Sequence, residues 1–331
     1  MKRIMLFLCL AFVGAAQAQT PVRFLHEWRF EGHVAPFLVA RDKGYFKAEG
    51  LDASVDPGTG SLNTINQVAS GNYQLGIADI NSLIRYRDNA ANVPIKAVMM
   101  VYDSPPFAIL TLKKNNITKP KDLEGRTLGA PAADGAWAQF PILAKLNGID
   151  MSKVRVDNVG FPVREALLAQ GKVDAVTAFG SNALGLRANN ISQDEIVVLM
   201  MRRFGLDLYG SAIFAHPDFM KNQPKAVAGF NRALIRGFQD TVRDPEAAID
   251  ILMRHNPVAK RDVELARLKL VIEQSYVTDE VRANGFGGVD MQRLERSIEQ
   301  LGIAFKFINR PKAADIFTAE FLPPRGERLI K

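Results

Sequence analysis

The stretch "HEWRFEGHV", residues 26–34, crowds together side chains that could bind a metal, catalyse a reaction or hold a ligand. Trp28 offers a flat aromatic face, Glu31 a carboxylate and His33 an imidazole. A metal site is disfavoured, because His26 and His33 do not have the spacing of an HExxH motif. On the sequence alone, Trp28 can equally well stack on a ligand or belong to the core. For His33 the pattern favours capping the helix or donating a hydrogen bond to a ligand, and a plain structural role is the alternative.

A second group of candidates follows in "GTGSLN" and at the end of an apolar run. Gly60 and Ser61 are expected at a helix N-terminus, where free N–H groups favour negative or electron-rich ligand groups. The third glycine of a dinucleotide-binding GxGxxG motif is missing. Asp79 ends the strand-like run "YQLGIAD" and could accept hydrogen bonds from an amine, or it could cap the next helix.

The remaining candidates lie where other predicted strands end or helices begin. Aromatic and amide side chains predominate among them, which suits a planar ligand better than a bare anion that would need several converging cations. Arg164 is the cation in this region that could pair with a carboxylate or sulfonate. These ligand-binding candidates are Tyr102, Asp103, Asp134, Phe161, Phe179, Asn182 and Tyr209.

The elements that must position these residues alternate along the chain. From Val22 to Phe204, short apolar runs alternate with helix-period segments, which is typical of α/β proteins with parallel sheets. Beyond Phe204 a single strand-like run, "LYGSAIFAHPDF", is followed by helical segments, so this strand is expected to pair back into the first sheet. The chain would then cross between two lobes near 110–112 and again near 206–209. Such a molecule is a hinged clamshell whose cleft lies at the carboxyl ends of the strands.

Composition narrows the function classes. The chain has 331 residues, of which 47% are hydrophobic and 23% charged, as expected for a globular protein of about two domains. Residues 1–18 resemble a secretory signal peptide cleaved after Ala18. The single cysteine, Cys9, lies within it, so the mature chain would lack disulfides, thiolate nucleophiles and cysteine-bound metals. The formal charge of +7 is spread without a polybasic run, which argues against nucleic-acid binding.

Four stretches resemble a known family. They are "EWRFEGHVAPFLVARDKGYFKAEGLD", "GTGSLNTINQVASGNYQLGIAD", "KPKDLEGRTLGAP" and "ALLAQGKVDAVTAF", which together cover most of residues 22–215. They are similar to type II periplasmic binding proteins, specifically the nitrate/sulfonate/taurine-type solute-binding proteins of ABC importers with their thiamine-pyrimidine-precursor branch. The resemblance implies an α/β fold with a discontinuous lobe 1 (19–110 and 207–331), a lobe 2 (111–206) and C-terminal helices on lobe 1.

The same resemblance implies a function. Such proteins are periplasmic monomers that bind one small molecule, use no cofactor or metal, and deliver the molecule to a membrane permease powered by an ATPase. An aromatic residue at the position of Trp28 commonly stacks on the ligand. The pyrimidine-binding branch would be expected to carry an acid near the end of "VDAVTAFGSNA", where this chain has Asn182. That difference argues against an amino-pyrimidine ligand.

Two alternatives remain from the sequence. Fungal thiamine-pyrimidine synthases share the fold, but they carry a cysteine-rich "CCCFC" iron motif that this chain lacks. No GxSxG elbow, phosphate-binding P-loop or zinc motif occurs either. A binding protein of this kind could also report to a membrane receptor instead of a permease, and a neighbouring permease gene would separate these two roles.

Overall fold

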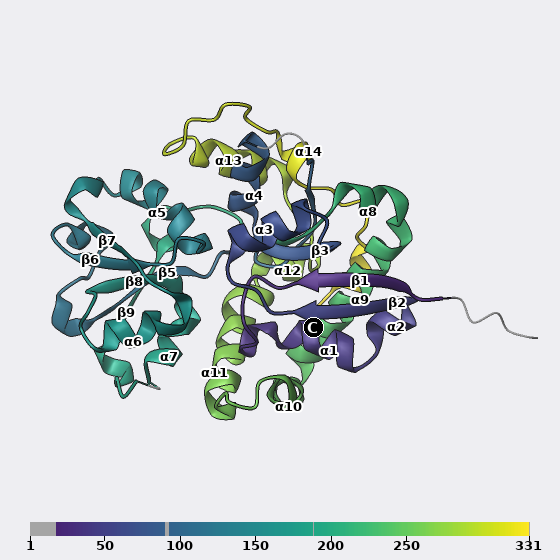
Figure 1. Cartoon of the computed structure of the whole chain (residues 1–331), viewed down its shortest axis with the longest axis horizontal. Helices are drawn as coiled ribbons and strands as arrows, with labels where there is room; N and C mark the ends of the chain where they lie inside the picture. Colours follow the sequence, from purple (N-terminus) through teal and green to yellow (C-terminus); the bar gives the residue numbers. More distant parts are fainter. Residues whose placement is uncertain (1–17, 90–92, 188, 331) are drawn as a thin grey trace, which may run out of the picture.

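The computed structural model describes residues 18–89, 93–187 and 189–330. The predicted signal peptide, apart from Ala18, lies outside the described residues. Two five-stranded sheets form two lobes that lie side by side (Figure 1). Among the described residues, no helix combines the length and apolar character needed to cross a bilayer.

The sheet of lobe 1 has the strand order β2-β1-β3-β10-β4. Strand β1 pairs in parallel with β2 and β3, whereas β10 runs antiparallel to both of its neighbours, β3 and β4. The strands are β1 (Thr20–Leu25), β2 (Leu51–Asp56), β3 (Leu75–Asp79), β4 (Lys96–Met100) and β10 (Ser211–Ala215).

The sheet of lobe 2 repeats this plan, with the order β7-β6-β8-β5-β9. Strand β6 pairs in parallel with β7 and β8, and β5 runs antiparallel to β8 and β9. The strands are β5 (Phe107–Leu112), β6 (Thr127–Ala130), β7 (Arg155–Asn158), β8 (Ala175–Phe179) and β9 (Ile196–Met200).

The predicted α/β clamshell is confirmed, with two corrections. Each sheet is mixed, because the strand that enters a lobe directly after a crossing, β5 or β10, runs antiparallel to its neighbours. The first crossing lies between Met100 and Phe107, because β5 belongs wholly to the sheet of lobe 2; the predicted boundary after Leu110 would cut this strand. The second predicted boundary, after Leu206, falls in the connection from β9 to β10.

Helices cover both sheets, and several of them begin at the cleft. Helix α3 follows β2 and helix α5 follows β6, so both N-termini lie at the carboxyl ends of parallel strands. In lobe 1 the helices that alternate with strands are α1 (Ala35–Asp42), α2 (Tyr45–Ala48), α3 (Ser61–Ala69) and α4 (Ile80–Asn89). In lobe 2 they are α5 (Gly135–Leu146), α6 (Arg164–Ala169) and α7 (Ala183–Arg187).

The C-terminal third is helical and packs mainly on lobe 1. The Phe24 ring lies 5.4 Å from the Phe37 ring of α1 and 5.2 Å from the Phe230 ring of α9, so both helices cover one face of the sheet. Helix α9 approaches α1 so closely that a Cβ on Gly237 would lie 2.4 Å from the Pro36 carbonyl oxygen. The helices are α8 (Pro217–Asn222), α9 (Pro224–Arg243), α10 (Pro245–His255), α11 (Arg261–Val271), α12 (Asp279–Asn284), α13 (Met291–Leu301) and α14 (Ala313–Ile316).

One C-terminal helix also reaches lobe 2. Helix α11 contacts the short 3₁₀ helix Gly32–Val34 of lobe 1, and on lobe 2 it contacts α7 and the 3₁₀ turn Gly180–Asn182 (Figure 1). It therefore spans the cleft between the lobes.

Candidate functional site

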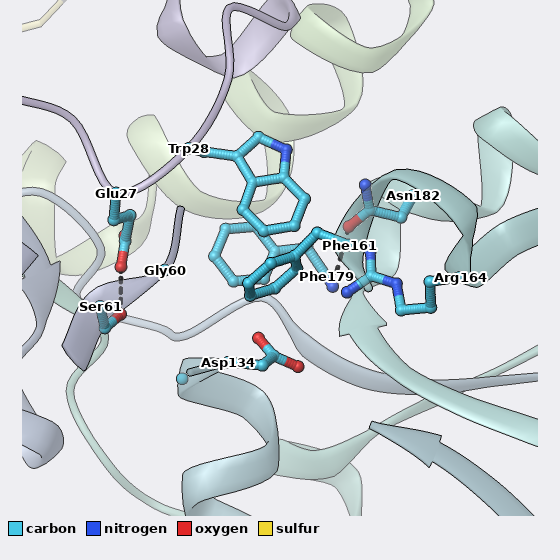
Figure 2. A pocket seen from close by; sticks show the side chains of 10 residues that line it. Glu27, Trp28, Gly60, Ser61, Asp134, Phe161, Arg164, Phe179 and Asn182 are labelled. Carbon is cyan, nitrogen blue, oxygen red and sulfur yellow. Dashed lines mark hydrogen bonds between the residues drawn. The ribbon is translucent and has the colours of Figure 1, made fainter. Parts of the chain in front are cut away.

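A small cavity with a volume of about 20 Å³ lies between the two lobes, and we call it the interlobe pocket (Figure 2). Lobe 1 supplies residues that follow β1 or begin α3, and lobe 2 supplies residues at the start of α5 and α6 and at the end of β8. The lining residues are Glu27, Trp28, Gly60, Ser61, Asp134, Gly135, Phe161, Arg164, Phe179 and Asn182.

Aromatic rings occupy the centre of the interlobe pocket. The Trp28 ring meets the Phe161 ring of the other lobe edge to face, with 4.5 Å between centroids and an interplanar angle of 88°. The indole Nε1 donates a hydrogen bond of 3.1 Å to Glu31 Oε2, which fixes the ring orientation. The sequence predicted that Trp28 ends the first strand. In the structure β1 ends at Leu25, and Trp28 lies three residues further along, in a bend. The ring thus faces lobe 2 instead of the core.

A buried cation lies at the lobe 2 side of the pocket. Arg164 has no exposed surface, and its Nη2 donates to Glu165 Oε1 at 2.6 Å. Its guanidinium carbon is 5.5 Å from the Trp28 ring centroid, within the range of a cation–π interaction. Arg164 Nη1 has no hydrogen-bond partner among the described residues. It is therefore a donor available to a ligand (Figure 2).

A buried carboxyl group lies at the lobe 1 side. Ser61 donates a hydrogen bond to Glu27, and Ser61 Oγ also accepts one of 3.2 Å from the Asp79 backbone N–H. Burial raises the pKa of Glu27 to about 7, and the nearby carboxylates of Asp79 and Asp134 act in the same direction. The Glu27 carboxyl group can thus hold a proton near neutral pH, so it can either donate or accept a hydrogen bond.

This raised pKa predicts a pH-dependent contribution to stability. The folded chain holds a proton on Glu27 up to about pH 7, whereas a glutamate in the unfolded chain releases it near pH 4.5. The contribution of Glu27 to the free energy of unfolding is therefore fully present below pH 4.5 and is lost as the pH rises through 7. The difference between the folded and unfolded pKa values corresponds to about 3 kcal/mol. Glu27→Gln mimics the protonated form and should flatten the fall in unfolding free energy between pH 4.5 and 7.5, as measured by urea denaturation.

Glu273→Gln provides the matched control, because Glu273 is exposed. It should leave the pH profile of the wild-type chain unchanged. If the free energy of unfolding fell equally steeply with pH in Glu27→Gln and in the wild type, the raised pKa would not belong to Glu27.

The two helix N-termini at the pocket carry different caps. The Asp134 side chain caps α5, accepting from the Ala136 N–H at 3.2 Å, and it also accepts from Thr177 Oγ1 at 2.8 Å. Burial raises the pKa of Asp134. Helix α3 instead begins after Gly60, whose φ of 108° is a conformation that suits glycine. Asn182 Oδ1 accepts from the Phe179 N–H at 3.0 Å, so this amide is held by the backbone of its own turn.

The lobes are in direct contact around the pocket. A Cβ on Gly60 would lie 2.6 Å from the Ala133 carbonyl oxygen, and a Cβ on Gly135 would lie 3.1 Å from Asp79 Cβ. Gln139 Nε2 of lobe 2 donates a hydrogen bond of 2.7 Å to Asp79 Oδ2 of lobe 1. The structure therefore represents a closed clamshell.

Some of the predicted site residues lie behind the pocket wall instead of on it. Asp79 is fully buried and accepts hydrogen bonds from Asn81 and Ser82, so it caps α4, which was its structural alternative. His33 is also buried, with its ring centroid 6.1 Å from that of Phe179. Burial lowers the pKa of His33 to about 4, and neither ring nitrogen has a partner among the described residues.

Three further predicted residues contact the C-terminal helices instead of the pocket. Tyr102 stacks on Tyr276, with ring centroids 5.8 Å apart. Asp103 accepts a hydrogen bond from Thr278. Tyr209 donates to Glu280 Oε1 at 3.0 Å, which agrees with its alternative as a packing residue beside the crossing. The structure therefore does not bring Tyr102, Asp103 or Tyr209 into the wall of the interlobe pocket.

The structure adds Glu27 to the predicted site and places Arg164 within it. Alternation along β1 would turn Glu27 away from the face that carries Trp28, but β1 ends at Leu25, so that alternation does not apply. Within 18–89, 93–187 and 189–330, no three His, Cys, Asp or Glu side chains are grouped so that they could hold a metal ion.

Comparisons with known proteins agree with this geometry. The model of the family described as NMT1/THI5 like matches residues 31–248. The riboflavin-binding protein RibY of Chloroflexus aurantiacus is 28% identical, over 87% of this chain and 82% of its own length. The formylaminopyrimidine-binding protein of Halalkalibacterium halodurans is 26% identical, over 95% of this chain and 96% of its own.

An enzyme is also among the relatives. The 4-amino-5-hydroxymethyl-2-methylpyrimidine phosphate synthase of Legionella pneumophila is 24% identical, over 74% of this chain and 77% of its own length. Among solved structures, the alkanesulfonate-binding protein SsuA of Xanthomonas axonopodis, bound to MOPS, has a TM-score of 0.68 and 14% identity, covering 93% of this chain and 99% of that chain. This last likeness shows the fold alone.

Proposed function

The chain belongs to the NMT1/THI5-like family, and from this premise we propose that it is the solute-binding component of an ABC importer. It captures a small planar organic molecule between its two lobes and delivers it to a membrane permease. The observation that carries the proposal is the interlobe pocket, in which aromatic rings from both lobes meet beside one buried carboxyl group and one buried guanidinium.

The geometry of closure supports binding by enclosure. Two crossings connect the lobes, and the lobes touch through Gly60 and Ala133 and through Gln139 and Asp79. Opening at the crossings would expose the pocket, and closing would shield the ligand from water. Among relatives, the names riboflavin-binding protein and formylaminopyrimidine-binding protein support a carrier role.

The side chains of the interlobe pocket favour a planar heteroaromatic ligand with both donors and acceptors. Trp28, Phe161 and Phe179 offer ring faces and edges, Arg164 Nη1 offers a donor, and Glu27 can donate or accept. A bare anion such as nitrate is disfavoured, because the charge of Arg164 is already paired with Glu165 and two further carboxyl groups lie near Glu27. A flavin or a pyrimidine carries such groups, and its ring would take the place of the contact between the Trp28 and Phe161 rings.

The second candidate is an enzyme of thiamine-pyrimidine synthesis, and the named synthase among the relatives is the reason to consider it. A cysteine-rich iron motif cannot form in this chain, since its single cysteine is Cys9. We therefore favour a carrier without chemistry of its own, which acts as a periplasmic monomer. A sensor role would use the same pocket and the same closure.

A thermal-shift panel tests the proposal. Pyrimidines, flavins, aromatic carboxylates, sulfonates and nitrate are added separately to the purified chain, and each mixture is checked for products by mass spectrometry. The expected result is a higher melting temperature with a planar heteroaromatic compound, recovered unchanged; at a hundredfold excess over Kd the gain is about 2.7 kcal/mol. Turnover of a compound without any thermal shift would overturn the carrier function.

A further inference from the structure

A second, larger hollow adjoins the interlobe pocket, with a volume of about 550 Å³. We call it the outer groove. Lobe 1 contributes Glu31 and residues of the α10–α11 region such as Asn256 and Arg267, and lobe 2 contributes Glu165 and residues of α7 such as Gly185. Asn182 lines both the outer groove and the interlobe pocket, so the two spaces share a wall.

Trp28 links the two spaces as well. Its ring lies against Phe161 inside the interlobe pocket, while its Nε1 donates to Glu31, which lines the outer groove. The Trp28 side chain therefore lies between the interlobe pocket and the wall of the outer groove. Another hollow shares Asp134 with the interlobe pocket, but there the backbones of the two lobes abut at Gly60 and Ala133. Between the interlobe pocket and the outer groove, the shared wall is instead formed by Asn182.

The buried charges of the outer groove are balanced within the protein; the lining also includes Lys260, which is exposed. Arg267 pairs with Glu31 at 3.0 Å and with Glu264 at 2.7 Å, and Arg29 also pairs with Glu31. The charges of Arg267 and Arg29 outweigh the effect of burial and lower the pKa of Glu31 to about 2, so this carboxylate is ionised and acts as an acceptor. A second anion would find the buried cations already paired.

Unused hydrogen-bonding capacity nevertheless remains. Arg267 is 4% exposed, and its Nε has no partner among the described residues. Carboxylate oxygens and guanidinium N–H groups therefore lie next to one another in the wall of the groove. A hydroxyl group can donate to the first and accept from the second, which a purely anionic or purely cationic group cannot do.

We propose, as a refinement that rests on the function proposed above, that the natural ligand carries a neutral hydroxylated chain on its planar ring and that the outer groove binds this chain. The interlobe pocket holds the ring beside Trp28 and Phe161. The chain passes Asn182 and lies between α7 and α11, where it contacts Arg267 and Glu31. A ring without such a chain uses only the inner space.

Calorimetry with matched probe pairs tests this division. Riboflavin is compared with lumichrome, which has the ring without the chain, and cytidine is compared with cytosine. The chain is expected to improve the affinity about tenfold or more in at least one pair. FMN, which adds a phosphate to the chain, is expected to bind no more tightly than riboflavin. Equal affinities within both pairs, no binding of either pair, or tighter binding of FMN would each overturn the proposal.

A variant that fills the groove gives an independent test. A Cβ on Gly185 would meet Glu165 Cγ at 3.7 Å and Arg267 Nη2 at 3.8 Å, which is ordinary contact, so Gly185→Leu should fold and occupy the groove. It should remove the gain from the chain while leaving the affinity for the ring compound unchanged. Gly326→Leu is the matched control, because a Cβ there meets no atom within 4 Å. Equal weakening of ring and chain compounds by Gly185→Leu would contradict a separate subsite.

Different results would contradict the carrier function and the binding of a chain in the outer groove. If the wider thermal-shift panel finds a planar ligand but the chain brings no gain, the carrier function stands and the outer groove is not a subsite. If no member of that panel binds, the carrier function itself fails.

Discussion

Replacing Trp28 with alanine is expected to weaken ligand binding at least about thirtyfold without unfolding the protein. The ring meets Phe161 across the cleft and lies 5.5 Å from the Arg164 guanidinium, so it contacts lobe 2 directly. Truncating a central aromatic anchor typically costs about 2 to 4 kcal/mol of binding free energy. Calorimetric titration with the ligand found by the thermal-shift panel measures the change, and far-UV circular dichroism measures the fold.

The second tryptophan provides the control. Trp137 lies on α5, stacked on Phe140 at 5.6 Å, and it lines a different hollow from the interlobe pocket. Trp137→Ala should leave the affinity close to that of the wild type. An unchanged affinity in Trp28→Ala would remove Trp28 from the ligand site.

Gly60→Ala is expected to hold the lobes apart. A Cβ at this position would lie 2.6 Å from the Ala133 carbonyl oxygen, a separation too short for any ordinary contact. Since Ala133 is backbone of the opposite lobe, the clash is relieved most readily by opening the cleft. The ligand should then bind at least about tenfold more weakly, because the open form cannot enclose it. Small-angle X-ray scattering should show a larger radius of gyration with saturating ligand.

Backbone strain alone would not produce this result, and a second glycine tests for it. Gly71 has a φ of +77°, but a Cβ there meets no atom within 4 Å. Gly71→Ala therefore introduces an alanine at positive φ without an interlobe clash, and it should reduce stability while leaving closure and affinity unchanged. If both variants close normally over the ligand, the Gly60–Ala133 contact does not govern closure.

The sequence predicts the fold well because its signals are local. Apolar runs and helical periods alternate strongly up to Phe204, and the lone strand near Ser211 has no partner in its own neighbourhood, so its return to lobe 1 could be inferred. The antiparallel direction of β5 and β10 could not be inferred, because it depends on the position in the sheet that the strand takes after the chain crosses between the lobes. The same uncertainty displaced the first boundary into β5.

Site residues were predictable where they follow a strand within one lobe. Ser61, Asp134 and Phe179 are of this kind, and all three line the interlobe pocket. Tyr102 and Tyr209 also lie beyond strand ends, but the C-terminal helices cover them, and sequence periodicity does not say where those helices pack. Whether the lining residues bind the ligand remains a proposal that the variants above test.

The position of β10 has a consequence for the order in which the two lobes can form. All strands of lobe 2 come from the single stretch 107–200, so this sheet can be completed without the rest of the chain. In lobe 1, β10 lies between β3 and β4, so these two strands have no common ladder until residues 211–215 arrive from the far side of lobe 2. Pairing over such long sequence separations is slow. We therefore expect the lobe that carries Trp28 to be the later of the two to fold, so that the binding cleft is assembled last.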